Sequence, residues 1–124
     1  MNTMEIAEKM VALCREGKNA DAVKTLFADD CESIEAGAPP GSERAVKGIP
    51  AILGKTEWWL GNHEIHSSEI FGPWPHDDRF IVGFKFDVTN KPSGMRMQMD
   101  EVGLYTVKDG KIVREEFFYH MPGM

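Results

Sequence analysis

A glutamate at position 101 stands where the alternation of polar and apolar residues predicts an interior side chain. In the expected strand 95–107, one face is mostly polar, and the other carries methionines, Glu101 and Tyr105, because strand side chains alternate between two faces. Gly103 on that face leaves room beside the carboxyl group. Burying an unpaired carboxylate is costly, so Glu101 must be protonated or paired. A structural ion pair or a position at the rim is the alternative to a chemical role.

Glu35 is the second candidate. If the segment 31–36 is a short strand, Cys31, Ser33 and Glu35 share one face of it. The loop Gly37-Ala38-Pro39-Pro40-Gly41 follows directly and is able to cover the mouth of a cavity. The alternative is a solvated Glu35, since exposed glutamate is the common case.

Two carboxyl groups in an apolar pocket are suited to acid–base chemistry beside a carbonyl group. Loss of hydration raises the pKa of a carboxyl group and makes it a better base near neutral pH. A second acid that stays neutral can donate a hydrogen bond to the oxygen on which charge develops. Enolisation, aldol-type ring closure and dehydration all fit this arrangement, and the sequence does not choose among them.

Three helices are expected in the first half of the chain. Residues 3–16 form an amphipathic pattern, which Thr3 can cap and Gly17 can end. A short helix is predicted over residues 19–27, and a third begins at Gly48-Ile49-Pro50, where proline suits the first turn. The predicted inward stripe of this third helix is Ile49, Ile52, Leu53, Thr56, Trp59 and Leu60.

Strands are expected in the second half. They are predicted over residues 63–71, 79–89, 95–107 and 111–119, and the first of these is expected to end at Gly72-Pro73-Trp74-Pro75. Lys108-Asp109-Gly110-Lys111 is a strong hairpin signal. Helices followed by a run of antiparallel strands indicate an α+β fold with the helices on one face of the sheet.

Composition excludes several classes of partner. A chain of 124 residues is about one domain, and a net charge of −6 repels phosphate backbones and anionic lipid. No apolar run approaches the roughly 20 residues that cross a bilayer, and the N-terminus lacks the layout of a signal peptide. Cys14 and Cys31 form no CxxC motif. We expect a single cytoplasmic domain over residues 1–124 with free thiols and no nucleic-acid or membrane partner.

No motif predicts a cofactor or a metal ion. His63 and His66 are three residues apart on an expected strand, so their side chains face opposite ways. Phosphate-binding loops, GxGxxG, HExxH and nucleophile elbows are missing from the sequence. The parity of the last strand leaves open whether Glu115 or Glu116 faces inward.

Four segments resemble a known family. They are Leu26-Phe27-Ala28-Asp29-Asp30, the short strand that ends in Glu35, Gly48-Ile49-Pro50-Ala51-Ile52, and the hairpin from Gly103 to Val113. Together they are similar to the SnoaL-like and ketosteroid isomerase-like group of the nuclear transport factor 2-like superfamily. The resemblance implies a cone-shaped, curved antiparallel sheet that wraps around N-terminal helices and leaves a central pocket.

The resemblance also implies roles for individual residues. Glu35 falls at the position of the base that moves a proton beside a carbonyl group, and Glu101 is the nearest match to the acid that holds the oxyanion. The family's tyrosine on the first helix has no counterpart, and its position falls near Met10. The family often pairs through the outer face of the sheet, so a homodimer is expected. Val102 and Leu104 on the polar strand face agree with this.

The hypothesis from sequence is a cofactor-independent lyase, isomerase or cyclase that acts on a small, largely apolar carbonyl compound. Glu35 and Glu101 are its predicted catalytic residues. The predicted substrate-binding residues are Met10, Trp59, Phe84 and Tyr105. The alternative is a non-catalytic module of the same fold that binds a small molecule or serves dimerisation.

Overall fold

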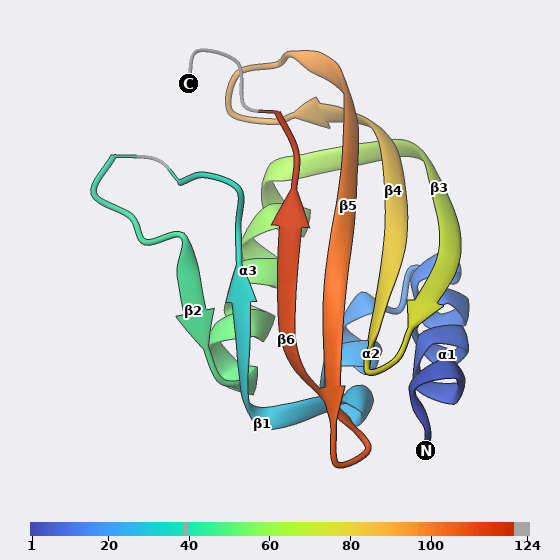
Figure 1. Cartoon of the computed structure of the whole chain (residues 1–124). Coiled ribbons are helices and arrows are strands. Elements are labelled where there is room, and N and C mark those ends of the chain that lie inside the picture. Colours follow the sequence, from blue (N-terminus) through green and yellow to red (C-terminus); the bar gives the residue numbers. More distant parts are fainter. Residues whose placement is uncertain (39, 121–124) are drawn as a thin grey trace.

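The computed structural model describes residues 1–38 and 40–120. In this part of the chain the elements follow each other as α1 (Thr3–Arg15), α2 (Asn19–Leu26), β1 (Phe27–Ile34), β2 (Ala45–Lys47), α3 (Ile49–Asn62), β3 (His63–His76), β4 (Arg79–Asn90), β5 (Arg96–Lys108) and β6 (Lys111–Phe118) (Figure 1). The strands form one sheet in the order β2-β1-β6-β5-β4-β3. Every described pair is antiparallel except β1 with β6, which is parallel.

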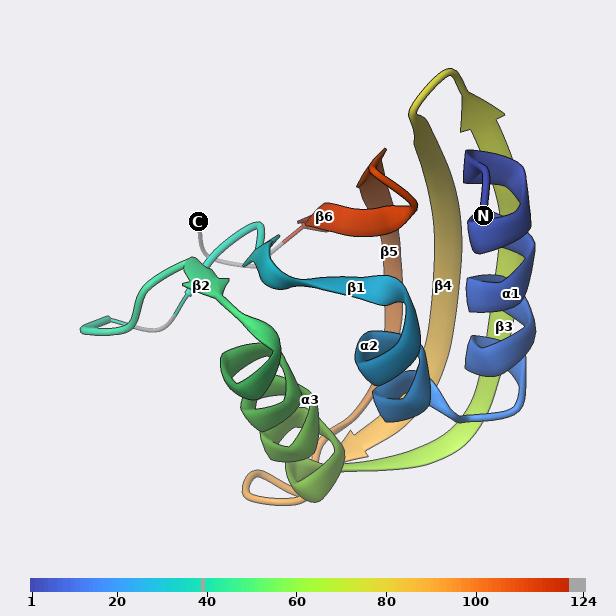
Figure 2. The same cartoon turned by 90° about the horizontal axis from the view of Figure 1, so that it is seen from below.

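The sheet is curved, and the helices lie on its concave side (Figure 2). The helix α1 packs against β3 and β4, whereas α3 contacts β1, β2 and β3. The α+β architecture with a curved sheet around the helices is therefore confirmed. None of the described helices covers the opposite, outer face of the sheet.

The helix boundaries follow local chemistry, with three corrections to the sequence prediction. Asn2 rather than Thr3 caps α1, because the Asn2 side chain accepts from the Glu5 amide and the Glu5 carboxylate accepts from the Asn2 amide. Phe27 is not the end of the second helix but the start of β1. Leu60 is exposed rather than inward-facing, since α3 runs beyond the edge of the core and buries only Ile52 deeply.

Strands β4 and β5 alternate as predicted, with Phe80, Val82, Phe84 and Val88 buried on one face. The prediction for the strand before them is wrong, because β3 continues through Gly72-Pro73-Trp74-Pro75 to His76. As the edge of the sheet, β3 pairs on one side only, so a proline without an N–H group is tolerated there. The pairing of β3 with β4 shifts register between Phe71 and Trp74, as it does at a β-bulge.

The strand predicted at residues 31–36 begins earlier, at Phe27, and its pairing with β6 shifts register between Phe27 and Glu32. Such an irregularity bends a strand. After the bend, Ser33 lies opposite Glu115 of β6. The Asp109-Gly110 turn then joins β5 to β6 with positive φ at both residues, as the hairpin signal predicts.

The core lies between the helices and the concave face of the sheet. Tyr105 is its largest fully buried side chain and stacks on Phe80 with ring centroids 5.0 Å apart. The space beside Glu101 that Gly103 was expected to leave open is occupied by the Tyr105 ring: a Cβ atom at Gly103 would lie 2.7 Å from Tyr105 Cε2. Gly103 is therefore required by close packing.

We predict that Gly103→Ala lowers the free energy of unfolding by about 1–3 kcal/mol, because the new methyl group would clash with the ring of Tyr105, which is fully buried. Gly54→Ala is the matched control: nothing lies within 4 Å of its new Cβ in α3, and alanine is the better helix former by about 1 kcal/mol. Urea denaturation of both variants measures the difference. An equal gain in stability for both would contradict the packing argument.

Candidate acid–base site

Three glutamates, two on strands β5 and β6 and one directly after β1, face the same end of the concave surface. The cross-strand register puts Ser33, Glu115 and Tyr105 in one row across β1, β6 and β5. Glu101 lies opposite Phe84 in another row across β5 and β4. Glu35 follows directly after the end of β1. Period two along each strand thus brings these carboxyl groups to one side of the sheet.

Glu115 is the most deeply buried of the three, with 5% of its surface exposed. Its carboxylate Oε2 accepts a hydrogen bond of 2.7 Å from the hydroxyl of Ser33, which is itself fully buried. Burial raises the pKa of the Glu115 carboxyl group from 4.5 to about 7, against the opposing effects of the Ser33 hydrogen bond and the Lys55 charge. This residue therefore gains or loses its proton near neutral pH.

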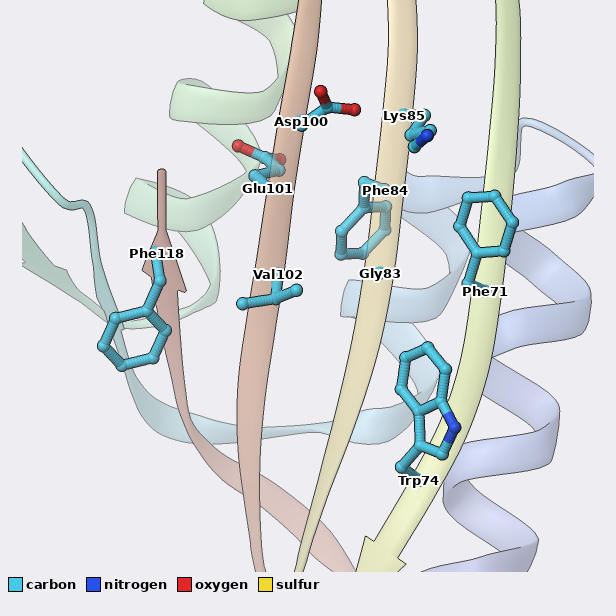
Figure 3. A pocket seen from close by; sticks show the side chains of 9 residues that line it. All are labelled: Phe71, Trp74, Gly83, Phe84, Lys85, Asp100, Glu101, Val102 and Phe118. Carbon is cyan, nitrogen blue, oxygen red and sulfur yellow. The ribbon is translucent and has the colours of Figure 1, made fainter. Parts of the chain in front are cut away.

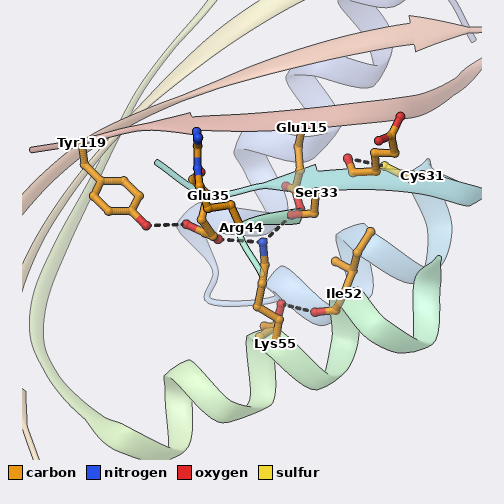
Figure 4. A network of polar contacts seen from close by, with 10 residues as sticks. Cys31, Ser33, Glu35, Arg44, Ile52, Lys55, Glu115 and Tyr119 are labelled. Carbon is orange, nitrogen blue, oxygen red and sulfur yellow. Dashed lines mark hydrogen bonds and ion pairs between the residues drawn. The ribbon is translucent and has the colours of Figure 1, made fainter. Parts of the chain in front are cut away.

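Lys55 is the cation of the site. It projects from α3 toward the sheet, where its Nζ lies 2.6 Å from Glu35 Oε1 and donates a hydrogen bond to Ser33 (Figure 4). The side chains of Lys55 and Glu35 are 25% and 27% exposed, so solvent reaches the pair. The ammonium group also lies 5.4 Å from the centroid of the Phe117 ring.

Tyr119 closes the other side of Glu35. Its hydroxyl donates a 2.8 Å hydrogen bond to Glu35 Oε2, so both carboxylate oxygens have a partner. Desolvation, followed by the Glu35 hydrogen bond and charge, raises the pKa of Tyr119 well above the usual value, and the phenol keeps its proton. A continuous chain of polar contacts thus joins Tyr119, Glu35, Lys55, Ser33 and Glu115 (Figure 4).

Glu101 differs from its neighbours because no described side chain donates a hydrogen bond to it. It is partly buried, as the period of the strand predicts. Burial raises the pKa of its carboxyl group to about 7, with further increases from the Glu35 and Glu115 charges and a partial offset from Lys55. The carboxyl groups of Glu35 and Glu101 are therefore close enough to interact, and Glu101 is protonated below about pH 7.

Aromatic rings line the side of the site next to Glu101. Phe84 stacks on Phe86 at 6.1 Å, Phe86 contacts Trp59 at 5.4 Å, and Phe84 meets Phe117 at 6.4 Å. Tyr105 contacts Phe117 edge-on, with ring centroids 6.3 Å apart. Burial raises the pKa of the Tyr105 hydroxyl well above the usual value. Three of the predicted lining residues, Trp59, Phe84 and Tyr105, are thereby connected through ring contacts.

Met10 lies elsewhere in the core. It is buried on α1, the helix that packs against β3 and β4. Figure 2 shows α1 and α3 at opposite ends of the concave side, with α2 between them. The helix that brings a polar group to the carboxylates is thus α3, through Lys55.

Sequence reasoning missed Lys55 and left Glu115 open. Lys55 precedes Thr56 of the predicted inward stripe, and helical spacing places it three residues after Ile52, so it sits on the border of that stripe. Ile112 and Glu115 are both buried although they are three residues apart, which simple alternation along a strand does not allow. The irregular pairing of β5 with β6 at Thr106 and Val107 explains this, and the sequence does not reveal it. Period-two counting fails across such a bulge.

Among the described residues, no group of histidine, cysteine, aspartate and glutamate side chains is arranged to hold a metal ion. No described helix is long and apolar enough to cross a membrane. Cys14 and Cys31 are buried free thiols. The chemistry that this site offers is proton transfer among carboxyl groups, an ammonium group and a phenol in partly desolvated surroundings.

Comparison with known proteins identifies the family. The family model of the SnoaL-like domain matches residues 1–119. The chain belongs to the SnoaL-like family. A candidate SnoaL-like polyketide cyclase from Mesorhizobium loti, also labelled a carbohydrate phosphatase, is 45% identical over 96% of this chain and all of that one, with a TM-score of 0.90. A search of curated proteins found no match.

More distant structures share the fold of this SnoaL-like protein. A nuclear transport factor 2-like protein from Burkholderia thailandensis is 17% identical over 97% of this chain and 92% of that one, with a TM-score of 0.82. A protein with a ketosteroid isomerase-like fold from Catenulispora acidiphila, in complex with trimethylamine, is 20% identical over 97% and 88%, with a TM-score of 0.72.

The raised pKa of Glu115 predicts how stability depends on pH. The folded state holds this proton up to about pH 7, whereas the unfolded chain releases it near 4.5. Stability is therefore lost as pH rises from about 4.5 to about 7, by at most about 3 kcal/mol for this group.

We predict that Glu115→Gln unfolds at similar urea concentrations to the wild type at pH 5 but loses less stability between pH 5 and pH 8, because glutamine cannot ionise. Glu116→Gln is the control, since Glu116 is more exposed and pairs with Arg114 at the surface. Urea denaturation at the two pH values measures the effect. Parallel losses in the wild type and both variants would rule out a buried proton at Glu115.

Proposed function

We propose that this SnoaL-like protein is a cofactor-independent acid–base lyase, isomerase or cyclase that acts on a small, largely apolar carbonyl compound. Glu35 removes a proton from the carbon beside the carbonyl group. Glu101, protonated near neutral pH, donates a hydrogen bond to the carbonyl oxygen. The observation that carries the proposal is the position of Glu101, a partly buried carboxyl group opposite Phe84 on the concave face, to which no described side chain donates a hydrogen bond. Burial, and then the nearby Glu35 charge, raise its pKa to about 7.

The distribution of polar and apolar groups supports an amphipathic substrate. Carboxyl groups, Lys55 and Tyr119 gather toward β1, β6 and α3, whereas the rings of Trp59, Phe84 and Phe86 continue away from Glu101. We propose that the apolar body of the substrate packs on these rings in the predicted central pocket, with its carbonyl group toward the carboxyl groups. Met10 belongs to the buried core on α1.

A non-catalytic binding module is the second candidate. The observation that favours it is that Glu35 already bonds to Lys55 and Tyr119, so both oxygens of the proposed base are engaged. The first candidate requires that a bound substrate displaces one of these partners or reaches a free lone pair of the carboxylate. Both candidates use the same ligand site, and they differ in whether a proton leaves the ligand.

We also propose that the protein is a homodimer that pairs through the outer face of its sheet. Phe71, Gly83, Val102 and Phe118 form one cross-strand row there over β3, β4, β5 and β6. They line a hollow of about 330 Å³ together with Trp74, which is 55% exposed, and with Phe84, Lys85, Asp100 and Glu101 (Figure 3). Apolar patches of this kind on a helix-free sheet face favour association with a second copy.

The protein is proposed to work in the cytoplasm, as its sequence predicts. Burial raises the pKa of both Cys14 and Cys31 to about 12, so neither thiol ionises at neutral pH. Buried free thiols of this kind are compatible with a reducing compartment.

Proton removal can be tested before the natural substrate is known. In D₂O, an enzyme that enolises a carbonyl compound exchanges the protons beside the carbonyl group for deuterium, which NMR detects. Across a panel of cyclic ketones and enones, we expect exchange with the wild type and a loss of at least about 100-fold with Glu35→Gln. Glu32→Gln changes a side chain on the opposite face of β1 and is expected to keep the activity.

The melting temperature of Glu35→Gln should stay close to that of the wild type, since glutamine can still accept from Tyr119 and a part-exposed ion pair contributes little. Tight ligand binding without exchange in any member of the panel would favour the binding module. Exchange that persists in Glu35→Gln would remove Glu35 from the role of base.

The dimer proposal predicts that wild-type protein sediments with the mass of two chains and that Val102→Glu sediments as one. A carboxylate in the middle of an apolar contact must be desolvated, which is costly. Ala51→Glu is the control, because Ala51 is exposed on the first turn of α3, on the helix side of the sheet. Wild-type protein that stays monomeric at high micromolar concentration would contradict the proposal.

A further inference from the structure

The ammonium group of Lys55 has hydrogen-bonding capacity to spare. An ammonium group carries three N–H donors. One side of the group meets Glu35 Oε1 at 2.6 Å, and another donor bonds to Ser33 Oγ. Among the described residues no third acceptor is present, and the side chain remains 25% exposed. The remaining donor is therefore available to a ligand on the concave side of the sheet.

The position of the group is fixed from three directions. The backbone of α3 supplies it, Ser33 and Glu35 of the β1 segment hold its end, and the ring of Phe117 lies 5.4 Å away (Figure 4). Two charged or polar anchors and an aromatic face limit the rotamers open to a long side chain. Such a preorganised donor loses little freedom when a ligand binds.

We propose that Lys55 is a further catalytic residue, which binds the carbonyl oxygen of the substrate and stabilises the negative charge that develops on it. This inference rests on the proposed function, in which Glu35 is the base.

The charge balance of the reaction favours a cation at this place. When the C–H bond breaks, the proton goes to Glu35, and the electron pair of that bond passes into the carbonyl group, so an enolate oxygen carries the charge. Glu35 becomes neutral in the same step. One negative charge thus moves from the carboxylate to the substrate oxygen, and the Lys55 ammonium group stays beside both. Return of the proton to another carbon, or loss of a leaving group, completes the reaction.

Glu101 and Lys55 then act on the same oxygen by different means. Glu101 donates from its protonated carboxyl group, and this donor disappears once the pH passes the pKa of about 7. Lys55 contributes the positive charge of an ammonium group that is held next to the Glu35 carboxylate. A purely structural Lys55 would hold Glu35 and Ser33 in place equally well, but it would not discriminate between a neutral ligand and its anion.

A phenol that resembles an enolate when ionised tests this discrimination. The probe is 2-naphthol, whose neutral and anionic forms differ in absorption, and the background variant is Glu35→Gln, which mimics the base after it has accepted the proton. Bound 2-naphthol is expected to ionise at a lower pH than the free compound. Lys55→Met in the same background should raise that pH by about one unit or more, a tenfold loss of preference for the anion.

Two further variants serve as controls for a packing defect at position 55 and for a general effect of a lysine-to-methionine substitution. Lys55→Arg keeps the charge and should retain most of the preference for the anion, so a mere packing defect at position 55 is distinguished. Lys24→Met, on the exposed side of α2, makes the same substitution away from the site and should leave the ionisation of the probe unchanged.

Two outcomes would overturn the inference in different ways. If bound 2-naphthol ionises at the same pH with and without Lys55, the lysine holds the site together but does not bind the oxygen, and the proposed function stands. If Glu35→Gln binds neither form of 2-naphthol, the ligand site itself is absent, and the inference and the proposed function fall together.

Discussion

Electrostatic repulsion among three carboxyl groups is the constraint on which this site depends. Glu35, Glu101 and Glu115 lie on the concave side of the sheet. Burial is the main cause of the raised pKa of Glu101, and the charges of Glu35 and Glu115 raise it further. Two features offset the repulsion. The Lys55 ammonium group pairs with Glu35 and lowers the pKa values of the other two groups, and burial keeps a proton on Glu101 and Glu115 up to about pH 7. The site is thus close to neutral while it holds its proton donors, and it becomes negative as the pH rises.

The fold provides this arrangement through long-range pairing. The N-terminal strand β1 inserts beside the last strand β6 as a parallel neighbour, which places Ser33 against Glu115 across 82 residues of sequence. The helix α3 packs against β1 and β2, and Lys55 reaches Ser33 and Glu35 from it. The Tyr105 ring packs tightly over Gly103 on the same face of β5 as Glu101. Few of these contacts are local, so the site exists only in the complete fold.

Much of this architecture could be predicted from local patterns. Period-two alternation identified the buried faces of β4 and β5, and with them the interior position of Glu101; the Asp109-Gly110 turn was equally clear. The rest depends on tertiary structure. An edge position lets β3 continue through two prolines, and a bulge hides the facing of Glu115. Lys55 lies at the border of a helical stripe, where a lysine is usually solvated, and only the position of α3 against β1 brings it to the carboxylates.

The central claim is that two carboxyl groups of this site keep their protons to near neutral pH. A ¹³C NMR titration of protein labelled at the glutamate side-chain carboxyl carbon, assigned with Glu101→Gln and Glu115→Gln, measures this directly. We predict that Glu101 and Glu115 titrate around pH 7 and that the charge of Glu115 raises the pKa of Glu101. If both titrate near 4.5, as carboxyl groups in water do, the site is solvated and the account is contradicted.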